Sequence, residues 1–175
     1  MTNWYDEVDK IYKDDSENPE MKPASEFDPD EECIELLTHF EGFSATSYVD
    51  PVGVITIGHG FTKGVKMGDT ITFEESVKRK LREVDEHWKG IQSHINSPIS
   101  QGICNALASW AYNVGVGAAR RSTLLKKLNL KDYEGAADEL LRWDKAGGRT
   151  LAGLTRRRKA EREMFLNRDW TKFKI

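Results

Sequence analysis

Three side chains that together could cleave a glycosidic bond lie close in the sequence: Glu41, Asp50 and Thr56. Such a cleavage needs a group that donates a proton to the leaving oxygen and a carboxylate on the other side of the sugar ring. Glu41 would donate the proton, Asp50 would orient a water or stabilise oxocarbenium charge, and Thr56 would hold that water. The spacing alone is a weak signal, because 31% of the chain is charged. Each carboxylate also fits a plain role, as a solvated helix-end acid or as a turn former.

A helix that ends at Gly42 is expected to carry Glu41. Asp28 is a good N-cap, Pro29 suits the first helical position and Gly42 is a natural stop. The apolar residues of this segment recur at helical spacing: Cys33, Ile34, Leu36, Leu37 and Phe40. Glu41 would lie in the last turn, at the negative end of the helix dipole, which disfavours the carboxylate and favours the protonated acid.

A small β lobe is expected next, carrying the other two groups. Residues 50–53, Asp-Pro-Val-Gly, have the composition of a turn, and residues 54–57 are typical of a β-branched strand. Gly64 and Gly68 punctuate a second small β segment, which predicts a lobe of two or three strands. A hairpin that folds back on the helix end would bring all three groups to one cleft. The distance between the carboxyl groups of Glu41 and Asp50 stays open. About 5 Å would indicate a reaction that retains the anomeric configuration, and about 6.5–9.5 Å one that inverts it.

Helices are expected over most of the remaining chain. A long one begins with a capping box at Thr72 and Glu75 and keeps apolar residues at helical spacing as far as Ile95. Further helices are predicted near residues 99–115, 122–128, 132–143 and 155–167, with a glycine-containing loop at 144–150. The order predicts an α+β fold, with a small β-hairpin lobe and a larger helical lobe joined by the long helix.

The first 27 residues differ from the rest. A short amphipathic helix is predicted there, with an apolar stripe made by Trp4, Tyr5, Val8, Ile11 and Tyr12. Residues 13–27 then have the composition of a linker. The predicted division is an acidic extension at residues 1–27 and a catalytic domain at residues 28–175. The extension would dock on the body or fray, or act as a partner-binding or self-inhibiting arm.

Charge is distributed unevenly along the chain. Residues 1–32 hold 12 acidic and 3 basic residues, a net charge of −9, whereas residues 33–175 hold 17 acidic and 23 basic, a net charge of +6. A basic body favours a polyanionic target, either nucleic acid or the bacterial envelope. The apolar runs fall short of a membrane span and the acidic start is unlike a signal peptide. Synthesis in the cytoplasm without stable membrane insertion is therefore expected.

The cysteines and a basic run have plain interpretations. Cys33 and Cys104 are predicted to be buried thiols, and a disulfide between them would need an oxidising compartment. No Cys/His spacing indicates a metal site, and neither a metal nor a cofactor is expected. The run Arg156-Arg157-Arg158-Lys159 invites a nucleic-acid interpretation, but consecutive helical residues cannot all line one groove. A solvated face is expected, with one or two arginines paired to acids and no nucleic-acid partner.

Several motifs of the sequence resemble those of a known protein family. One stretch of the chain strongly resembles the active-site stretch of phage-type lysozymes. It contains Glu41-Gly-Phe, then Tyr48-Val-Asp50-Pro-Val-Gly53, then Val-Ile-Thr56-Ile-Gly58-His-Gly60. These are the lambdoid and T-even phage endolysins of the muramidase class. Three later segments, at residues 106–115, 121–129 and 153–162, resemble the central and C-terminal parts of the family. The likeness covers roughly residues 31–168.

The resemblance implies a lysozyme-like α+β fold and a function. It implies an endolysin that hydrolyses the β-1,4 bond between N-acetylmuramic acid and N-acetylglucosamine in peptidoglycan and lyses the host, with an inverting outcome by analogy. In the family the residue matching Glu41 is the general acid, and those matching Asp50 and Thr56 position the attacking water. Tyr112 and Thr123 match positions that contact glycan in the T-even enzyme. A monomer is expected, acting on peptidoglycan in the periplasm.

Two departures from the family stand out. Lambdoid relatives usually have Gly-Tyr-Gly-His-Thr where this chain has Gly-His-Gly-Phe-Thr at residues 58–62. Phe61 cannot make the charge pair that a family histidine makes in the T-even enzyme, and His59 is expected to lie at the cleft edge or in the packing. The second departure is the acidic start. Some lambdoid endolysins begin with a membrane signal-anchor, so the resemblance implies holin-dependent release here.

Two rival functions stay open. A lytic transglycosylase on a related fold would use Glu41 alone and form an anhydro product without water, whereas a requirement for Asp50 favours hydrolysis. A non-catalytic wall-binding or virion structural protein could retain the fold. In that case Glu41→Gln would leave the biological activity unchanged.

Overall fold

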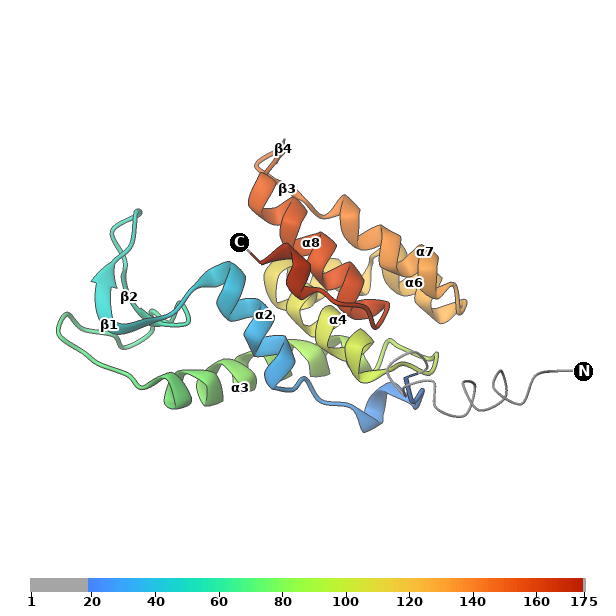
Figure 1. Cartoon of the computed structure of the whole chain (residues 1–175), viewed down its shortest axis with the longest axis horizontal. Coiled ribbons are helices and arrows are strands. Elements are labelled where there is room, and N and C mark those ends of the chain that lie inside the picture. Colours follow the sequence, from blue (N-terminus) through green and yellow to red (C-terminus); the bar gives the residue numbers. More distant parts are fainter. Residues whose placement is uncertain (1–18, 175) are drawn as a thin grey trace, which may run out of the picture.

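The computed structural model describes residues 19–174. The elements in chain order are η1 (Ala24–Glu26), α2 (Glu31–Glu41), β1 (Ser44–Val49), β2 (Ile55–Gly58), α3 (Phe73–Gln92), α4 (Gln101–Val114), α5 (Val116–Arg120), α6 (Thr123–Asn129), α7 (Tyr133–Glu139), η2 (Leu140–Arg142), β3 (Lys145–Ala146), β4 (Arg149–Thr150), α8 (Ala152–Phe165) and η3 (Thr171–Phe173). A small lobe built on β1 and β2 stands apart from a larger helical lobe, and α3 runs from one to the other (Figure 1). The predicted α+β fold class is confirmed.

The β lobe is built on one antiparallel hairpin. Strand β1 pairs with β2 in a register that sets Tyr48 opposite Thr56, with an irregularity between Ser44 and Tyr48. The predicted second β segment is wrong, because residues 62–69 form turns and the strand-like contact nearby is an isolated bridge between Thr46 and Thr70. The reason is local: Gly64 and Gly68 lie at φ +74° and +94°, where an extended strand cannot continue.

The helix α2 ends where the sequence predicted but starts later. Its N-cap is Asp30, whose side chain accepts the backbone N–H of Glu32, and the predicted N-cap Asp28 lies outside the helix. A contact with α4 explains why the helix is capped by Asp30 and not by Asp28. Asn105 accepts the backbone N–H of Asp30 at 3.1 Å and donates its amide to the Asp30 carboxylate at 2.8 Å. The C-cap is Gly42, at φ +82°, which leaves Glu41 as the last helical residue.

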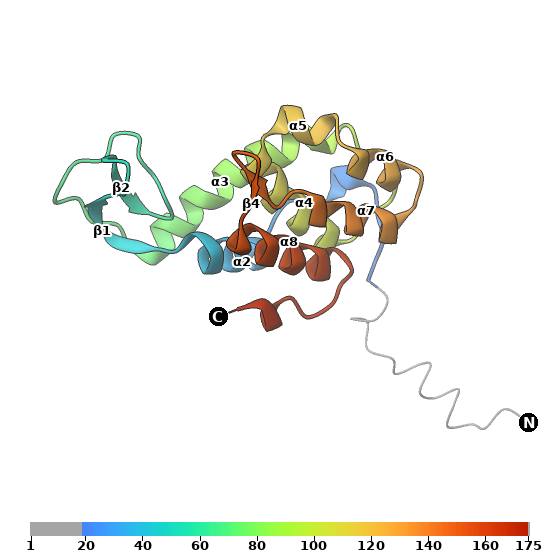
Figure 2. The same cartoon turned by 90° about the horizontal axis from the view of Figure 1, so that it is seen from above.

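The long helix α3 joins the two lobes (Figure 2). It begins with the predicted capping box, in which Thr72 and Glu75 satisfy each other's backbone N–H groups. It ends at Gln92, one turn before the predicted Ile95. Its buried face includes a lysine, Lys80, in line with Val84, Trp88 and Ile91. A charged group on this stripe needs a partner inside the protein.

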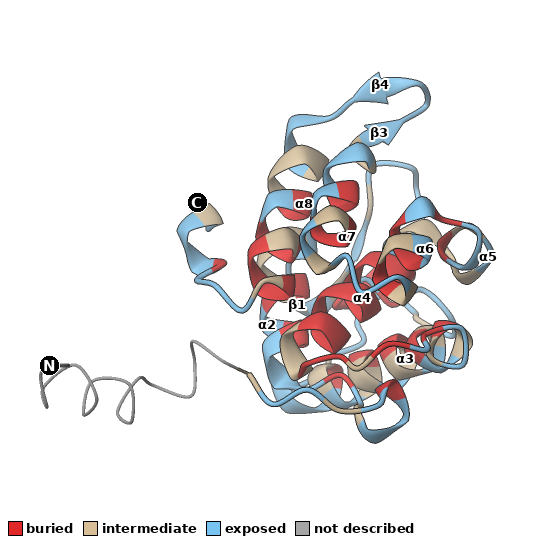
Figure 3. Ribbon diagram, turned by 90° about the vertical axis from the view of Figure 1, so that its right-hand side faces the viewer, coloured by how far each residue is buried: buried red, intermediate tan, exposed pale blue. Residues whose placement is uncertain are grey.

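The core of the helical lobe lies around α4. Nine of its residues are buried, and α2, α3 and α8 pack against it (Figure 3). Two elements were not predicted from the sequence: the short helix α5 and the hairpin β3–β4, which occupies the expected loop at residues 144–150. Gly147 and Gly148 connect its strands at φ +59° and +77°. Two consecutive residues with positive φ match the turn geometry that a two-residue hairpin loop prefers.

Residues 22–27, which fall within the predicted linker, pack on the helical lobe. The backbone of Lys22 exchanges two hydrogen bonds with Ile99, and Ala24 is 4% exposed. The indole N–H of Trp88 donates to the carbonyl of Phe27 at 2.8 Å. The predicted amphipathic helix at Trp4–Tyr12 lies outside the described residues, so the division at residue 27 stays a prediction.

The two cysteines are buried and free, as the sequence analysis predicted. Cys33 on α2 and Cys104 on α4 are both 0% exposed. Burial raises the pKa of each thiol well above its ordinary range. Because the thiolate is the reactive species, the folded protein is expected to react with a disulfide reagent at pH 8 only as fast as it unfolds, and both thiols should react at once in guanidinium. Rapid labelling of the native protein would contradict this burial.

Candidate active site

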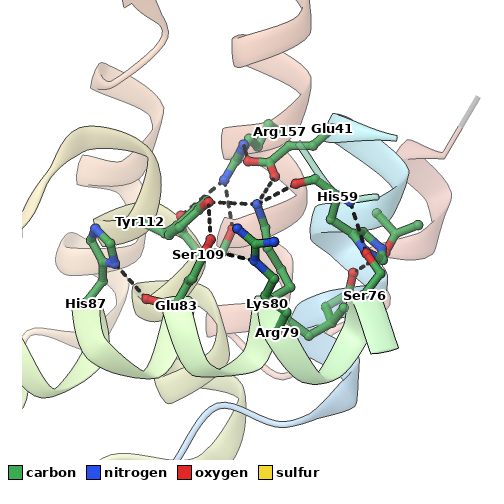
Figure 4. Close-up of polar contacts among 12 residues, drawn as sticks. Glu41, His59, Ser76, Arg79, Lys80, Glu83, His87, Ser109, Tyr112 and Arg157 are labelled. Atoms are coloured by element: carbon green, nitrogen blue, oxygen red, sulfur yellow. Dashed lines mark hydrogen bonds and ion pairs between the residues drawn. The ribbon is translucent and has the colours of Figure 1, made fainter. Parts of the chain in front are cut away.

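Glu41 is held at the end of α2 by two buried cations. Its side chain is 24% exposed. Its Oε2 lies 2.8 Å from Nζ of Lys80 on α3, and its Oε1 lies 3.1 Å from Nη1 of Arg157 on α8 (Figure 4). The two contacts fix the direction of the carboxyl group at the C-terminal end of the helix. Neither cation was predicted as a partner of Glu41 from the sequence.

Arg157 belongs to a buried ionic group. Its Nε donates to Oε1 of Glu161 at 3.1 Å, and its Nη2 donates to the carbonyl of Ser109 at 3.1 Å. Arg158 donates to the other oxygen of Glu161 at 2.5 Å. Burial alone would lower the pKa of Arg157, but the charges of Glu161 and Glu41 outweigh it and raise the pKa above its ordinary value.

The predicted solvated face for this basic run is therefore wrong for two of its four residues. Arg157 is 4% exposed and Arg158 is 0% exposed, while Lys159 is exposed. Successive side chains on a helix point in directions about 100° apart, so part of any such run must face the core. The prediction that one or two arginines pair with acids is confirmed by their contacts with Glu161.

Asp50 and Thr56 lie on the hairpin of the β lobe. Oδ1 of Asp50 accepts the backbone N–H groups of Val52 at 3.0 Å and Val54 at 2.8 Å, which fixes the carboxylate at the turn. Within the described part of the chain, its Oδ2 has no hydrogen-bond partner. Thr56 is 4% exposed, and its hydroxyl donates to the carbonyl of Val54 at 3.1 Å. The hairpin thus orients both groups through its own backbone.

The hairpin is attached to Glu41 through His59 and Lys80. The carbonyl of His59, which follows β2, accepts a hydrogen bond from Nζ of Lys80 at 3.0 Å. The same ammonium contacts Glu41. Figure 4 shows the two side chains and the His59 carbonyl converging. This contact links the strand that carries Thr56 to the end of the helix that carries Glu41.

Of the two predicted substrate-binding residues, one belongs to the network around Glu41. The hydroxyl of Tyr112 on α4 lies 2.8 Å from Nζ of Lys80 and 3.3 Å from Oε2 of Glu83. Thr123 is the first residue of α6 and is exposed. Contact of either residue with glycan stays a prediction.

His59 packs between the two lobes. Of its two predicted places, the cleft edge and the packing, the structure shows the packing. It is 0% exposed, with Nδ1 2.5 Å from Oγ of Ser76 and Nε2 2.7 Å from Oγ1 of Thr38. Its ring packs against the rings of Phe43 and Phe73. Burial lowers the pKa of His59, the charge of Lys80 lowers it further, and the charge of Glu41 opposes both. The imidazole is neutral in the folded protein at neutral pH.

This burial predicts a pH dependence of stability. The unfolded chain binds a proton at His59 more readily than the folded one, so the free energy of unfolding should fall as the pH drops below about 6.5. The slope from this one group is at most about 1.4 kcal/mol per pH unit. Urea unfolding from pH 8 to pH 5 should show a smaller decline for His59→Gln than for wild type. The exposed His94→Gln serves as control and should keep the wild-type slope, and equal slopes for all three proteins would refute the assignment.

A cavity lies beside Thr38 and Phe73, outside the contacts of Glu41. It has a volume of about 780 Å³, and its walls come from α2, α3 and Lys174, with Ile34 and Leu81 among the apolar ones. Neither Glu41 nor the hairpin lines it. Among residues 19–174 no cluster of three His, Cys, Asp or Glu side chains could hold a metal ion. No helix in that range is long and apolar enough to cross a membrane.

Comparison with known proteins decides the family. The sequence pattern of the family described as phage lysozyme matches residues 38–161, which include the candidate acid, the hairpin and Arg157. The chain belongs to the phage lysozyme family. The endolysin of Salmonella phage P22 is 40% identical over 141 residues, which are 77% of this chain and 94% of that protein. The SAR-endolysin of Enterobacteria phage P21 is 42% identical over 127 residues, 72% of this chain and 77% of that protein.

Solved structures of phage lysozymes have the same fold. A mutant of P22 lysozyme matches with a TM-score of 0.73 at 35% identity, over 80% of this chain and 99% of that one. The endolysin of Escherichia coli O157:H7 phage FAHEc1 matches with a TM-score of 0.72 at 30% identity, over 80% of this chain and 94% of that one. The predicted family, the lysozyme-like fold and the class of glycoside hydrolase are confirmed.

Sequence reasoning missed two residues that contact the candidate acid. Lys80 stands four residues before Val84 on the buried stripe of α3, and a lysine at that position signals a buried partner. Arg157 stands four residues before Glu161, a spacing that brings the two side chains together on a helix. Neither signal names Glu41 as the partner, because that contact spans 116 residues for Arg157.

Proposed function

We propose that this member of the phage lysozyme family hydrolyses the β-1,4 bond between N-acetylmuramic acid and N-acetylglucosamine, with Glu41 as the general acid. The observation that carries the proposal is the setting of Glu41, whose two carboxylate oxygens are held by Lys80 at 2.8 Å and Arg157 at 3.1 Å beside the hairpin. A carboxyl group with a fixed orientation can deliver its proton to the leaving oxygen without first searching for that geometry.

Asp50 and Thr56 are proposed to position the attacking water. The turn fixes Oδ1 of Asp50 through two backbone N–H groups, while Oδ2 is open to a water molecule. A carboxylate there would accept a proton from the water as it attacks and would stabilise positive charge on the sugar ring. Thr56 stands on the paired strand, where its β-branched side chain has few rotamers. Its hydroxyl, which donates its proton to the carbonyl of Val54, is proposed to accept a hydrogen bond from the same water.

The proposed macromolecular partner is the glycan strand of peptidoglycan, with Tyr112 and Thr123 as candidate contacts. The relatives named endolysin support this choice. Three further proposals are taken from the sequence: the protein is a monomer, it acts in the periplasm, and its release from the host cytoplasm depends on a holin. Gel filtration tests whether the protein is a monomer. Expression with and without a holin, with lysis as the readout, tests the release.

The role of Asp50 is tested by the clearing of outer-membrane-permeabilised Gram-negative cells. Asp50→Asn keeps an oxygen for the turn but removes the charge, and it is expected to lower the clearing rate by about 10²-fold or more. Asp69→Asn is the matched control, because Asp69 also accepts a backbone N–H in a turn of the same lobe, at 2.8 Å from Lys66. The control should clear at the wild-type rate. A fully active Asp50→Asn would favour the lytic transglycosylase, which needs Glu41 alone.

A further inference from the structure

Lys80 is a lysine in the core of the molecule. Its side chain is 2% exposed, on the stripe of α3 that also buries Val84 and Trp88. A buried ammonium is costly unless it is paired and hydrogen-bonded, and a hydrophobic residue at this position would pack without that cost. The lysine therefore needs an explanation beyond the packing of α3.

All three donors of the ammonium group have an acceptor. Nζ lies 2.8 Å from Oε2 of Glu41, 3.0 Å from the carbonyl of His59 and 2.8 Å from the hydroxyl of Tyr112. An ammonium has three N–H bonds, so these contacts use its full capacity. The acceptors belong to the end of α2, the residue after β2 and the last turn of α4, and Figure 4 shows the three labelled residues around Lys80. One nitrogen atom thus joins Glu41 to both lobes.

The charges around Glu41 come from several elements. Arg157 on α8 faces its other oxygen, and Arg157 is itself paired with Glu161. Glu83 on α3 reaches the Tyr112 hydroxyl at 3.3 Å but does not contact Lys80. Arg79 stacks over Phe61, 4.1 Å from the ring centre. His59 contributes its carbonyl, and its neutral ring faces Ser76 and Thr38.

Lys80 and Arg157 therefore are the cations in direct contact with Glu41 among the described residues. Arg157 is shared with Glu161, whereas Glu41 is the carboxylate that contacts Lys80. The ammonium of Lys80 therefore serves chiefly to hold the Glu41 carboxyl group.

We propose that Lys80 is a positioning residue for the general acid. It fixes the direction of the Glu41 carboxyl group relative to the hairpin, because the same ammonium holds the chain just after β2. This inference rests on the proposed role of Glu41. A misdirected general acid slows the chemical step more than it weakens substrate binding, so the loss of Lys80 should appear in kcat and not in KM.

The test is the measurement of kcat and KM on purified peptidoglycan for the wild type and three variants. Lys80→Met removes the charge and all three donors, Lys80→Gln removes the charge but keeps an amide donor, and Lys80→Arg keeps the charge. Both neutral variants are expected to lower kcat at least about tenfold with little change in KM. Lys80→Arg should retain most of the wild-type kcat, because it keeps a charged donor toward Glu41.

Ser76→Ala is the matched control for a purely structural effect. Ser76 lies one turn before Lys80 on the same buried face and contacts the same His59, but it does not contact Glu41. It should lower the melting temperature while kcat stays near that of wild type. If Lys80→Met does not fold, Lys80→Gln and Lys80→Arg still give the comparison of neutral with charged.

The outcomes separate this inference from the proposed function. Inactive wild-type protein would overturn the proposed function, and this inference with it. Active wild type together with neutral variants of unchanged kcat would overturn only the role of Lys80. An equal loss of kcat in Lys80→Arg would also overturn it, because the effect would then follow packing and not the charged contact with Glu41.

Discussion

Glu41→Gln is expected to lower the rate of peptidoglycan hydrolysis by about 10²–10⁴-fold. The amide has nearly the shape of the carboxylic acid, and its oxygen can still accept a hydrogen bond from Lys80 or Arg157. Its N–H groups are far too weakly acidic to transfer a proton to the leaving oxygen. The expected loss is therefore chemical, and it should appear in kcat with little change in KM.

Glu35→Gln is the matched control for this variant. Glu35 lies on the same helix, its side chain is 56% exposed, and it pairs with Lys174 at 2.5 Å, away from Arg157 and Lys80. It should keep wild-type activity. Near-ultraviolet circular dichroism should show that Glu41→Gln is folded. A folded Glu41→Gln that retains wild-type activity would remove the general acid from the mechanism and favour a non-catalytic role for the fold.

Glu161→Gln is expected to cost about 3–5 kcal/mol in the free energy of unfolding. Glu161 is 0% exposed and accepts hydrogen bonds from Arg157, Arg158 and the hydroxyl of Ser109. When Glu161 loses its charge, the guanidinium groups of Arg157 and Arg158 stay buried but lose the carboxylate that they share. At about 2–4 °C per kcal/mol for a chain of this size, the melting temperature should fall by roughly 10 °C.

The control for Glu161→Gln is a variant that removes the charge from a solvent-exposed ion pair. Asp138 on α7 is 58% exposed and pairs with Arg162 of α8 at 2.7 Å. Asp138→Asn should change the free energy of unfolding by less than about 1 kcal/mol, because water screens such a pair. Urea unfolding compares the two variants directly. Equal losses would mean that burial of Glu161 contributes little and that the account of this ionic group is mistaken.

The parts of the structure that depend on neighbours in sequence could be predicted. The end of α2 at Gly42, the capping box of Thr72 and the turn at Asp50 are determined by a few adjacent residues. The start of α2 could not be predicted in the same way. Asp28 and Asp30 are both good N-caps, and Asn105 of α4 selects Asp30 through two hydrogen bonds. That contact spans 75 residues.

The same limit applies to the candidate site. The residue types Glu, Asp and Thr in one stretch indicate the chemistry, and the resemblance to phage-type lysozymes indicates their roles. The environment of Glu41 depends on side chains from two distant helices, Lys80 and Arg157. Helical spacing shows that these residues face the core, but it does not show which acid they meet. The packing of α3 and α8 around α4 determines that.

Digestion of purified peptidoglycan in ¹⁸O-labelled water, followed by mass spectrometry of the released fragments, distinguishes hydrolysis from cleavage without water. Hydrolysis by Glu41 with a water positioned by Asp50 and Thr56 predicts reducing N-acetylmuramic acid ends that each carry one ¹⁸O atom. The same digestion with Glu41→Gln should release almost nothing. Anhydro ends without ¹⁸O would contradict the account, because the bond would then have been cleaved without water.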